Sequence, residues 1–395
     1  MDWRRFRFEY SIQLQSLPSD LIEIEAYRQA ALNLVLPPPW REQLDQLNRV
    51  RAVHGTTALE GNPLTEAEVR LQMEHLEESS EPPVNQSMEQ RQVRNAGLAQ
   101  AWVRERLAPG SAPLQLSDIL YLHQRLTEGS DEKDNVPGRL RTHRVVVGTP
   151  ELGGVHRGSP PEDLPRLMDE FVEFVNSKRC LDQHPVVRAL LAHFFLVTIH
   201  PFGDGNGRVS RLVEAGILFQ GGYNVLGFYG LSNFFYRNAD EYKRLLQQSR
   251  RAQPFDLTAF LAFGIKGFAT ELRGINDFIK AKLNRLVYRD TLVRAAGQRS
   301  GKRRRVLNNR EYGLLDFLLK ETEPVDPFSD APSRKIGLSE LVQAPYVQAV
   351  YKDVKRRTLW RELVRLAEMG FIRVSAAAEI EDSTIEIDFD AIGKY

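Results

Sequence analysis

The chain has 395 residues, of which 42% are hydrophobic and 27% are charged, and its formal net charge is +1. This composition is ordinary for a globular protein, and the length allows two or three domains that each have a hydrophobic core. The only cysteine, Cys180, excludes an intramolecular disulfide framework and gives no support for a thiolate metal site. The near-zero net charge argues against a general attraction to nucleic acid, although charge can still be concentrated locally.

The sequence shows no targeting or membrane segment. No apolar run of the signal-peptide type follows the opening MDWRRFRFEY, and no stretch of about 18 apolar residues suggests a membrane span. We therefore expect a cytoplasmic protein that has no membrane partner.

The first part of the chain, residues 1–50, is predicted to be an N-terminal helical segment. It is interrupted at LPPPW, where three prolines break any helix. From Trp40 onward, apolar side chains recur at helical spacing, at Leu44, Leu47, Val50, Val53 and Leu59. We expect this helix to end at EGNP, because Gly61 is a natural left-handed cap and Pro63 cannot continue a helix.

The next part of the chain is predicted to be mainly α-helical. Helical spacing recurs over residues 87–107, 117–127, 161–178, 184–199, 207–220 and 238–250. The exception is RVVVGTPELGG, residues 144–154, where a β-branched run is followed by glycines. This pattern is typical of a short β-hairpin or flap.

The composition changes at GQRSGKRRRVLNNR, which has six basic residues and no acidic ones. We expect residues 276–305 to be a helical and basic linker, with a separate domain at 306–395. In that domain helical segments precede IRVSAAAEIEDSTIEIDF, whose alternation predicts a two-stranded ribbon. Three helices followed by a ribbon predict a winged helix-turn-helix.

The last predicted helix has Leu359, Leu363 and Leu366 at core spacing, and arginines at the other positions. Arg356, Arg357, Arg361 and Arg365 suit a recognition helix that contacts DNA, and the basic residues at 299–305 would extend this charge. The alternative is a domain that docks on a partner and leaves its arginines in water, because Glu362 and Glu368 dilute the positive face.

The most informative motif is HPFGDGNGRVSR, residues 200–211, which follows an apolar segment that ends at Ile199. Its glycines let backbone N–H groups converge at the start of the next helix, which is what a phosphate site requires. Arg208 and Arg211 lie three residues apart and project toward the same side, where they could bind further phosphate oxygens.

Asp204 and His200 complete the chemistry of this motif. A carboxylate inside an anion site is explained if a cation such as Mg²⁺ bridges it to the phosphates. His200 has the pKa range to accept a proton from an incoming hydroxyl. The spacing fits neither a Walker loop, an EF-hand nor a dinucleotide loop. The remaining alternative is a glycine-rich turn whose Asp and Arg form a structural salt bridge.

The chain resembles the Fic family on these residues. HPFGDGNGRVSR fits the signature H-P-F-x-[D/E]-G-N-G-R-x-x-R, and PGRLRTHRVVVG is similar to the family's flap, which pairs with the backbone of a target. TTALEGN, residues 56–62, is similar to the inhibitory motif [S/T]-x-x-x-E-[G/N]. The resemblance covers residues 40–260 and places a catalytic domain at 51–275, with an inhibitory helix near 45–61.

The resemblance implies an all-helical core with a β-hairpin flap, and transfer of AMP from ATP to a Ser, Thr or Tyr hydroxyl of a protein target. His200 is then the general base, and Asp204 holds Mg²⁺, with Mn²⁺ as an alternative. The nucleotide-binding residues are Gly203, Gly205, Asn206, Gly207, Arg208, Arg211 and Tyr242. The target-docking flap comprises Arg141, Val145, Val146, Val147 and Gly148. Lys243 replaces the second tyrosine of a pair frequent in the family.

The inhibitory residues implied by the resemblance are Thr56, Glu60 and Gly61. We expect Glu60 to pair with Arg211 and so to remove the arginine that would seat the γ-phosphate. The alternative is that Glu60 only ends a solvated helix. Two other functions remain open, a hydrolase that removes AMP with Glu60 positioning water, and a DNA-binding regulator whose Fic core only modifies itself. A homodimer is expected.

Overall fold

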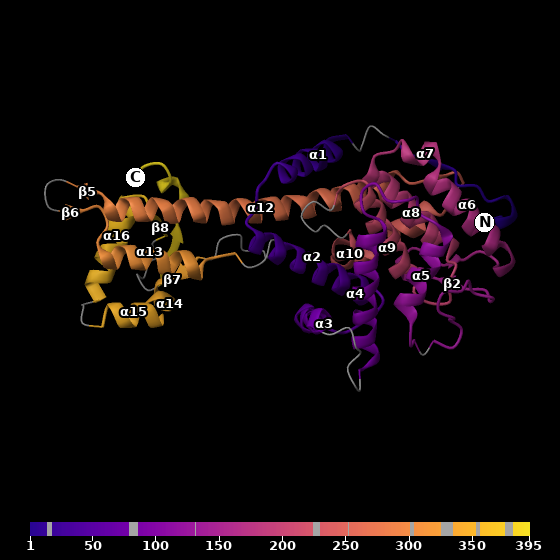
Figure 1. Cartoon of the computed structure of the whole chain (residues 1–395), viewed down its shortest axis with the longest axis horizontal. Coiled ribbons are helices and arrows are strands. Elements are labelled where there is room, and N and C mark those ends of the chain that lie inside the picture. Colours follow the sequence, from indigo (N-terminus) through magenta and orange to yellow (C-terminus); the bar gives the residue numbers. More distant parts are fainter. Residues whose placement is uncertain are drawn as a thin grey trace. The chain divides into compact units, whose positions relative to one another are not determined.

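The computed structural model describes residues 1–13, 18–78, 86–130, 132–223, 230–251, 253–300, 304–324, 335–352, 356–375 and 382–395. It divides into two compact units, Met1–Leu272 (unit 1) and Arg273–Tyr395 (unit 2). Helices dominate both units, as the sequence predicted (Figure 1). Within the described ranges, no helix combines the length and the apolar character needed to cross a bilayer.

Unit 1 begins with short elements and two longer helices. They are η1 (Trp3–Arg5), β1 (Tyr10–Ser11), α1 (Pro18–Leu32) and α2 (Pro38–Ala58). Helix α2 starts at the prolines of LPPPW, because the first turn of a helix needs no backbone N–H donors. Beyond the end of α2, Gly61 has φ of 90°, the left-handed conformation that the sequence predicted for it.

The six segments with helical spacing all form helices. Their bounds are α4 (Met88–Arg106), α5 (Leu116–Thr127), α6 (Leu164–Asn176), α8 (Pro185–Ile199), α9 (Asn206–Gln220) and α11 (Ala239–Ser249). The sequence pattern missed α3 (Glu66–Glu78), α7 (Lys178–Leu181) and α10 (Ser232–Arg237). Strand β4 (Phe255–Asp256) pairs in parallel with β1.

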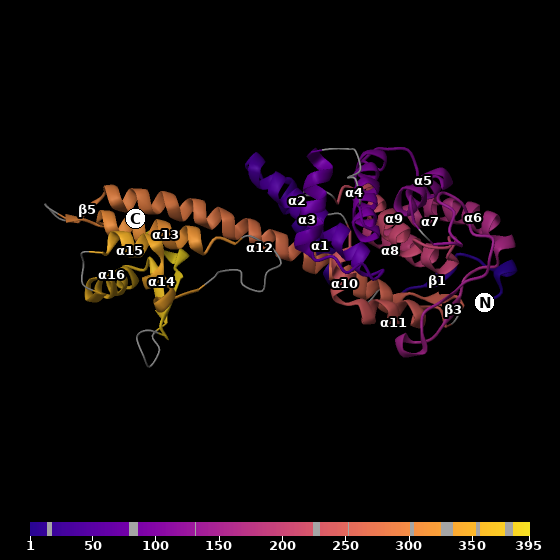
Figure 2. The same ribbon diagram turned by 90° about the horizontal axis from the view of Figure 1, so that it is seen from below.

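Helices α8 and α9 form the centre of unit 1 (Figures 1 and 2). Every residue of α8 from Val186 to Ile199 except Arg188 is buried, and α9 is buried from Asn206 to Phe219 except at Gly207. Helices α2, α4 and α5 pack on α9, and α6 packs on α8. Because other helices pack around α8 and α9, the ends of these two helices are fixed in position, and so is the loop that joins them.

The predicted flap is present. Strand β2 (Val146–Val147) pairs antiparallel with β3 (His156–Arg157), and the 3₁₀ helix η3 (Pro150–Leu152) lies in the turn between them. The turn packs on α11, and Figure 2 shows α11 beside β3. The hairpin therefore spans residues 146–157, and Gly158 N–H extends it by donating to Val145 O. Ser159 N–H donates to Ile199 O, which places the hairpin beside the loop between α8 and α9.

Helix α12 (Thr258–Gly297) crosses the boundary between the units, so most of the expected linker is helical. Two short strands follow, β5 (Arg299–Ser300) and β6 (Arg304–Arg305), which pair antiparallel. Residues 301–303 of the predicted basic arm lie outside the described residues.

Unit 2 contains helices and a small antiparallel sheet around one core. The elements are α13 (Asn309–Glu321), β7 (Ile336–Gly337), α14 (Leu338–Gln343), α15 (Pro345–Val350), α16 (Arg356–Glu368), β8 (Ile372–Ser375) and β9 (Thr384–Ile387). The strand order is β7-β9-β8, so the predicted ribbon gains a third strand. Leu359, Leu363 and Leu366 are buried as expected.

Candidate active site

The loop between α8 and α9 has a backbone that few sequences can adopt. His200 ends α8 with φ of 57°, and it is the one non-glycine residue in the described ranges with positive φ. Such a conformation is costly and persists where the surroundings impose it. Gly205, with φ of 77°, precedes the first turn of α9. The free N–H groups of that turn therefore face the loop.

Asn206 holds this loop closed. Its side-chain oxygen accepts from Phe202 N–H at 2.9 Å, and its Nδ2 donates to Phe202 O at 2.8 Å. The sequence placed Asn206 among the residues of the anion site. In the structure its amide is used to shape the loop, so it would act on a bound anion through the backbone.

A buried histidine that the sequence analysis missed contacts the loop between α8 and α9. His123 of α5 stacks on Phe202, with ring centroids 3.8 Å apart, and its Nε2 lies 3.2 Å from Asp204 O. Its Nδ1 accepts from Gly138 N–H. Burial lowers the pKa of His123 to about 4, so the ring is neutral near pH 7. In the sequence, His123 could have been noticed as a polar residue on the apolar face of the helix predicted at 117–127.

His200 has the protonation state of a base. Its Nδ1–H points at Val197 O, 3.4 Å away, which leaves the Nε2 lone pair available. Burial, together with the nearby Arg250 guanidinium, lowers the pKa of His200 to about 4. The imidazole is therefore neutral near pH 7 and can accept a proton.

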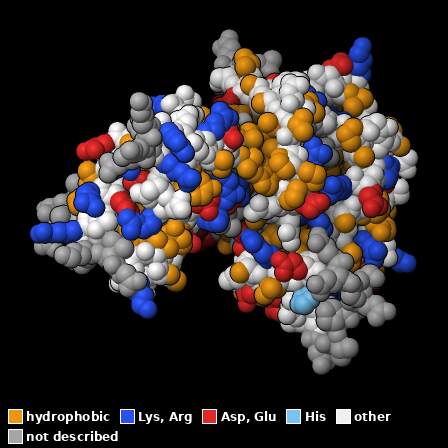
Figure 3. Space-filling model, turned by 60° about the vertical axis from the view of Figure 1, so that its left-hand side comes forward, with side chains coloured by type: hydrophobic (Ala, Val, Ile, Leu, Met, Phe, Trp, Pro, Cys, Tyr) orange, Lys and Arg blue, Asp and Glu red, His pale blue; other side chains and the backbone are white. Residues whose placement is uncertain are grey.

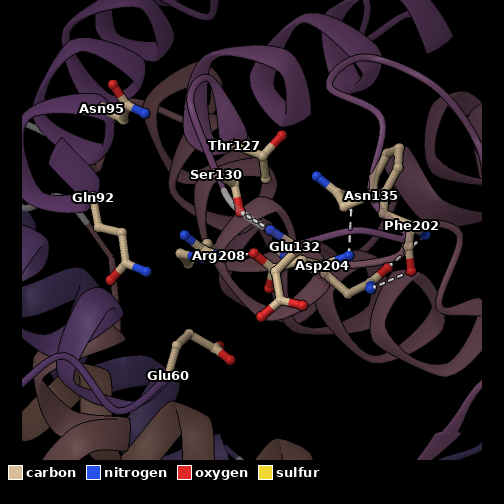
Figure 4. A network of polar contacts seen from close by, with 12 residues as sticks. Glu60, Gln92, Asn95, Thr127, Ser130, Glu132, Asn135, Phe202, Asp204 and Arg208 are labelled. Carbon is tan, nitrogen blue, oxygen red and sulfur yellow. Dashed lines mark hydrogen bonds and ion pairs between the residues drawn. The ribbon is translucent and has the colours of Figure 1, made fainter. Parts of the chain in front are cut away.

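Asp204 and Arg208 form an ion pair of 2.5 Å at the start of α9 (Figure 4). The Asp204 side chain is 30% exposed and its other oxygen accepts from Gly205 N–H. No group of three or more His, Cys, Asp or Glu side chains in the described ranges could hold a metal ion by itself. One exposed carboxylate beside an anion loop suits Mg²⁺, which takes its other ligands from phosphate and water.

The expected contact between Glu60 and Arg211 is present. Arg211 Nη2 lies 2.6 Å from Glu60 Oε1, and Arg211 also donates to the hydroxyl and carbonyl oxygens of Thr56 at 2.8 and 3.0 Å. Burial alone would raise the pKa of Glu60, but the Arg211 guanidinium lowers it, and the net direction is downward. In Figure 4 the Glu60 carboxylate points toward the side where Arg208 and Asp204 lie.

Gly207 makes this contact sterically possible. A Cβ atom at position 207 would lie 2.3 Å from Glu60 Oε1 and 2.9 Å from Arg211 Nη1. The Glu60 carboxylate therefore occupies space directly above the first turn of α9, where a phosphate would also have to lie.

Comparison with known proteins identifies the domain that contains this loop. Residues 113–218, from before α5 to the end of α9, match the model of the Fic/DOC family. They form a Fic domain.

Relatives named as enzymes match the same region. The chain is 34% identical over 171 residues to the protein adenylyltransferase Fic of Drosophila ananassae, which covers 43% of this chain and 32% of that protein. It is 32% identical over 174 residues to the protein of the same name from Aedes aegypti, covering 44% of this chain and 33% of that protein. The matching part thus spans about a third of the length of these relatives.

Solved structures show the same fold. A Fic family protein from Desulfovibrio desulfuricans superimposes with a TM-score of 0.54 over 97% of this chain and 98% of that chain, at 18% identity. Fic-1 from C. elegans superimposes with a TM-score of 0.52 over 64% of this chain and 70% of that chain, at 25% identity.

Tyr242 of α11 lies behind Arg211 in a buried polar chain. His193 Nε2 lies 2.8 Å from the Tyr242 hydroxyl, and His193 Nδ1 lies 2.6 Å from Glu214 Oε2. Tyr242 is only 4% exposed, so it is not an aromatic residue of the helix surface. His193 and Glu214 were missed, since their 21-residue separation has no local signature.

Arg141 differs from its expected role as a target-docking residue. Its guanidinium is buried and donates to the carbonyl oxygens of His200 at 2.8 Å and Ser159 at 2.6 Å. Burial lowers its pKa to about 10, and it has no carboxylate partner within the described ranges. Arg141 therefore holds the strained end of α8 against the flap, and a target cannot reach it.

A cavity of about 320 Å³ opens beside the Fic motif. Its lining includes His200, Gly207, Arg211, Glu60 and Tyr242, together with Val147 and Gly148 of the flap. The other predicted flap residues, Val145 and Val146, line a neighbouring hollow. Arg250, which the sequence analysis missed, contributes to both spaces and donates to Thr198 Oγ1 at 3.0 Å.

The arginines predicted to contact DNA have different environments in unit 2. Arg365 pairs with the buried Glu311 and donates to Val306 O at 2.9 Å. Arg357 and Arg361 are exposed and have no carboxylate partner in the described part of the chain. The side chain of Arg356 lies outside the described residues. On the face drawn in Figure 3, Lys and Arg are interspersed with Asp and Glu.

Proposed function

We propose that this protein transfers AMP from ATP to the hydroxyl of a Ser, Thr or Tyr on a protein target, and that Glu60 restrains the reaction. The observation that carries the proposal is one cavity shared by a neutral His200, the first turn of α9 and the Glu60–Arg211 pair. The names of the relatives that match the Fic domain support the same activity. Because the match covers about a third of those proteins, the whole activity is a proposal for this chain.

His200 supplies the base. Its Nε2 accepts the proton of the target hydroxyl as that oxygen forms a bond to the α-phosphorus of ATP. The bond between the α-phosphorus and the bridging oxygen breaks in line, and pyrophosphate leaves. Arg141 is a positioning residue for this step, because it holds the carbonyl of His200 at 2.8 Å.

The start of α9 binds the phosphates. Backbone N–H groups around Gly205 and Gly207 and the guanidinium of Arg208 face the anion, where helix polarity favours negative charge. Asp204 would hold Mg²⁺, which would neutralise charge that develops on the phosphate oxygens. The Asp204–Arg208 ion pair keeps the carboxylate at the mouth of the loop until then.

Glu60 competes with the nucleotide for Arg211. With the pair formed, the γ-phosphate lacks its guanidinium partner, and the space over Gly207 is filled by a carboxylate. ATP bound in that state would be poorly aligned for in-line attack. Removing the Glu60 side chain should therefore raise the rate of transfer.

The test uses the full chain with α-labelled ATP and a cell lysate as the source of targets. Glu60→Gly should label targets strongly, and Glu60→Gly combined with His200→Ala should lose about 10²–10⁴-fold in rate. His143→Ala is the matched control, because this histidine does not line the cavity. Label that persists without His200, or that comes from γ-labelled ATP, would refute AMP transfer by this base.

The same site could run the reverse hydrolysis, with Glu60 orienting water. Release of AMP from a labelled target should then require Glu60 as well as His200. Comparing wild type with Glu60→Gly on a modified target separates the two directions, because transfer gains and hydrolysis loses when Glu60 is removed.

A DNA-binding role for unit 2 is the second candidate. It is supported by the exposed Arg357 and Arg361 on α16, and by the element order of a winged helix-turn-helix. Retention of a random DNA duplex at low salt by the full chain, lost in Arg357→Ala/Arg361→Ala, would support it. Equal retention by both proteins would contradict it.

A further inference from the structure

A second hollow, of about 750 Å³, lies beside the catalytic cavity and is lined on one side by the flap. Both flap strands contribute to it, through residues 144–146 and 155–158. Gln247 and Arg250 of the segment at and after the end of α11 line this hollow and the catalytic cavity alike. An extended chain that follows the flap away from His200 would therefore enter the hollow.

The charge of this hollow is one-sided. Four arginines line it, Arg144, Arg157, Arg250 and Arg251, and no Asp or Glu is among its lining residues. The nearest carboxylate to these guanidiniums is Glu162, which lies 3.9 Å from Arg144 with both side chains largely exposed. So exposed a pair neutralises little charge.

Arg250 makes the charge persist inside the protein. Its guanidinium donates to Thr198 Oγ1 and to Val197 O at 3.3 Å, which are neutral acceptors. Burial lowers the pKa of Arg250 to about 10, so it stays protonated at neutral pH without a carboxylate partner in the described ranges. A partly buried cation with only neutral partners favours an anion in the adjoining space.

From this geometry we infer that the hollow binds an acidic segment of the target protein, next to the hydroxyl that is modified. The inference rests on the proposed AMP transfer and names its substrate class. The flap would align the target's backbone, and the four arginines would select Asp and Glu side chains on the part of the target that lies beyond the flap. Selectivity would thus come from charge rather than from the backbone pairing, which any sequence can make.

Histidine ionisation does not contribute to this selectivity. His156 also lines the hollow, but its Nε2–H donates to Thr198 O and burial lowers its pKa to about 3. Guanidinium groups in general stay charged over the pH range in which proteins remain folded. The preference for an acidic segment should therefore be the same from about pH 6 to pH 9 and should weaken as salt rises.

Binding is measured first, without turnover. The probes are two fluorescent tyrosine-centred peptides that are identical except that Asp and Glu in one are Asn and Gln in the other. We expect the His200→Ala protein to bind the acidic peptide about fivefold more tightly at low salt. Adding Arg157→Glu/Arg251→Glu should abolish or reverse the preference; both side chains are exposed, so folding should be preserved.

The matched control is Lys178→Glu/Lys266→Glu, which changes the net charge by the same amount at two exposed positions outside the hollow. It should keep the preference for the acidic peptide. Equal binding of the two peptides by the His200→Ala protein, or an equal loss in the control, would overturn the inference. So would displacement of the acidic peptide by inorganic pyrophosphate and not by an unlabelled acidic peptide.

Transfer is measured second, in the Glu60→Gly background with α-labelled ATP. Preferential labelling of the acidic peptide, lost with Arg157→Glu/Arg251→Glu, supports both the transfer and the substrate class. Equal labelling of the two peptides overturns only the substrate class. Selective binding with no label in either peptide or in the enzyme itself would overturn the proposed function and leave the hollow as a site for acidic chains.

Discussion

The ion pair at the cavity and two ion pairs of unit 2, Glu311–Arg365 and Glu362–Arg310, are buried in opposite ways. At the cavity the cation is inside, since the side chain of Arg211 is 2% exposed and that of Glu60 is 36% exposed. In unit 2 the carboxylate is inside, with Glu311 1% exposed against 41% for Arg365, and Glu362 8% exposed against 41% for Arg310. The partner nearer to water is the one that can be exchanged.

This difference fits the restraint proposed for Glu60 and a structural role for the pairs of unit 2. Arg211 is fixed by Thr56 and by its burial, and the carboxylate it contacts comes from the residues after α2 that end at Gly61. A phosphate could replace that carboxylate without moving the arginine. In unit 2 the arginines neutralise buried carboxylates, and Glu311 also accepts from Asn308 N–H in the capping box of α13. Replacing one of these buried carboxylates by another anion would expose part of the folded interior to water.

The largest expected effect comes from acid. All eight histidines precede residue 201, and burial depresses the pKa of His123 to about 4 and of His156 to about 3. The unfolded chain takes up protons near pH 6.5, so this stability is complete above that pH and is lost as pH falls toward 4. Unit 1 should lose on the order of 6 kcal/mol in this window.

This loss can be measured by urea unfolding at several pH values, using chains that retain only Trp102 or only Trp360. The Trp102 signal should shift to lower urea as the pH falls, whereas the Trp360 signal of unit 2 should move little in the same window. Equal shifts of the two signals would contradict the prediction that acid destabilises unit 1 more than unit 2.

The next effect is on catalysis. Glu60→Gly should raise AMP transfer about 100-fold, which corresponds to about 2.7 kcal/mol. Glu60→Gln, which keeps the size but not the charge, should give a smaller rise. Equal rates for wild type and both variants, with unchanged melting temperatures, would show that the exposed carboxylate is not the exchangeable partner.

In unit 2 the corresponding change should alter stability and not activity. Glu311→Ala removes the partner of Arg365 and one half of the capping box, and should cost about 2 kcal/mol, a value reduced for the exposure of Arg365. Urea unfolding read at Trp360 measures the cost, with Glu368→Ala on the same unit as the control. A loss below about 0.5 kcal/mol would contradict the supporting role.

The smallest effect is expected for an arginine without a carboxylate partner. Arg361→Ala should change the stability of unit 2 by less than about 0.5 kcal/mol, because its side chain is exposed. If α16 contacts DNA, the same change should lower the salt dependence of binding by about one phosphate contact. A stability loss as large as that of Arg365→Ala would place Arg361 among the supports.

The sequence predicted the loop between α8 and α9 because its chemistry is local. His200, Asp204 and Arg211 lie within one motif, and the spacing alone puts them at one helix start. Glu60 and its pairing with Arg211 were also predicted, through the resemblance of TTALEGN to the inhibitory motif of the family. The helices followed from apolar periodicity, although α3 was missed because nearly half of its residues are charged.

The supporting residues could not be predicted because they depend on contacts far apart in the sequence. Arg141 reaches a carbonyl 59 residues away, and His123 reaches one 81 residues away. Nothing near Arg141 distinguishes a buried brace from a docking residue, and this is why its expected role was wrong. Arg250 likewise sits in a run of ordinary polar residues, and only the fold places it against α8.

The lack of a side chain at Gly207 links the proposed inhibition by Glu60 to the phosphate site. The same missing methyl at position 207 that opens α9 to a phosphate also admits the carboxylate that blocks it. Gly207→Ala would exclude both at once, so regulation cannot be removed there while catalysis is kept. Release of the proposed restraint would therefore have to act on the Glu60 segment, and the start of α9 would stay unchanged.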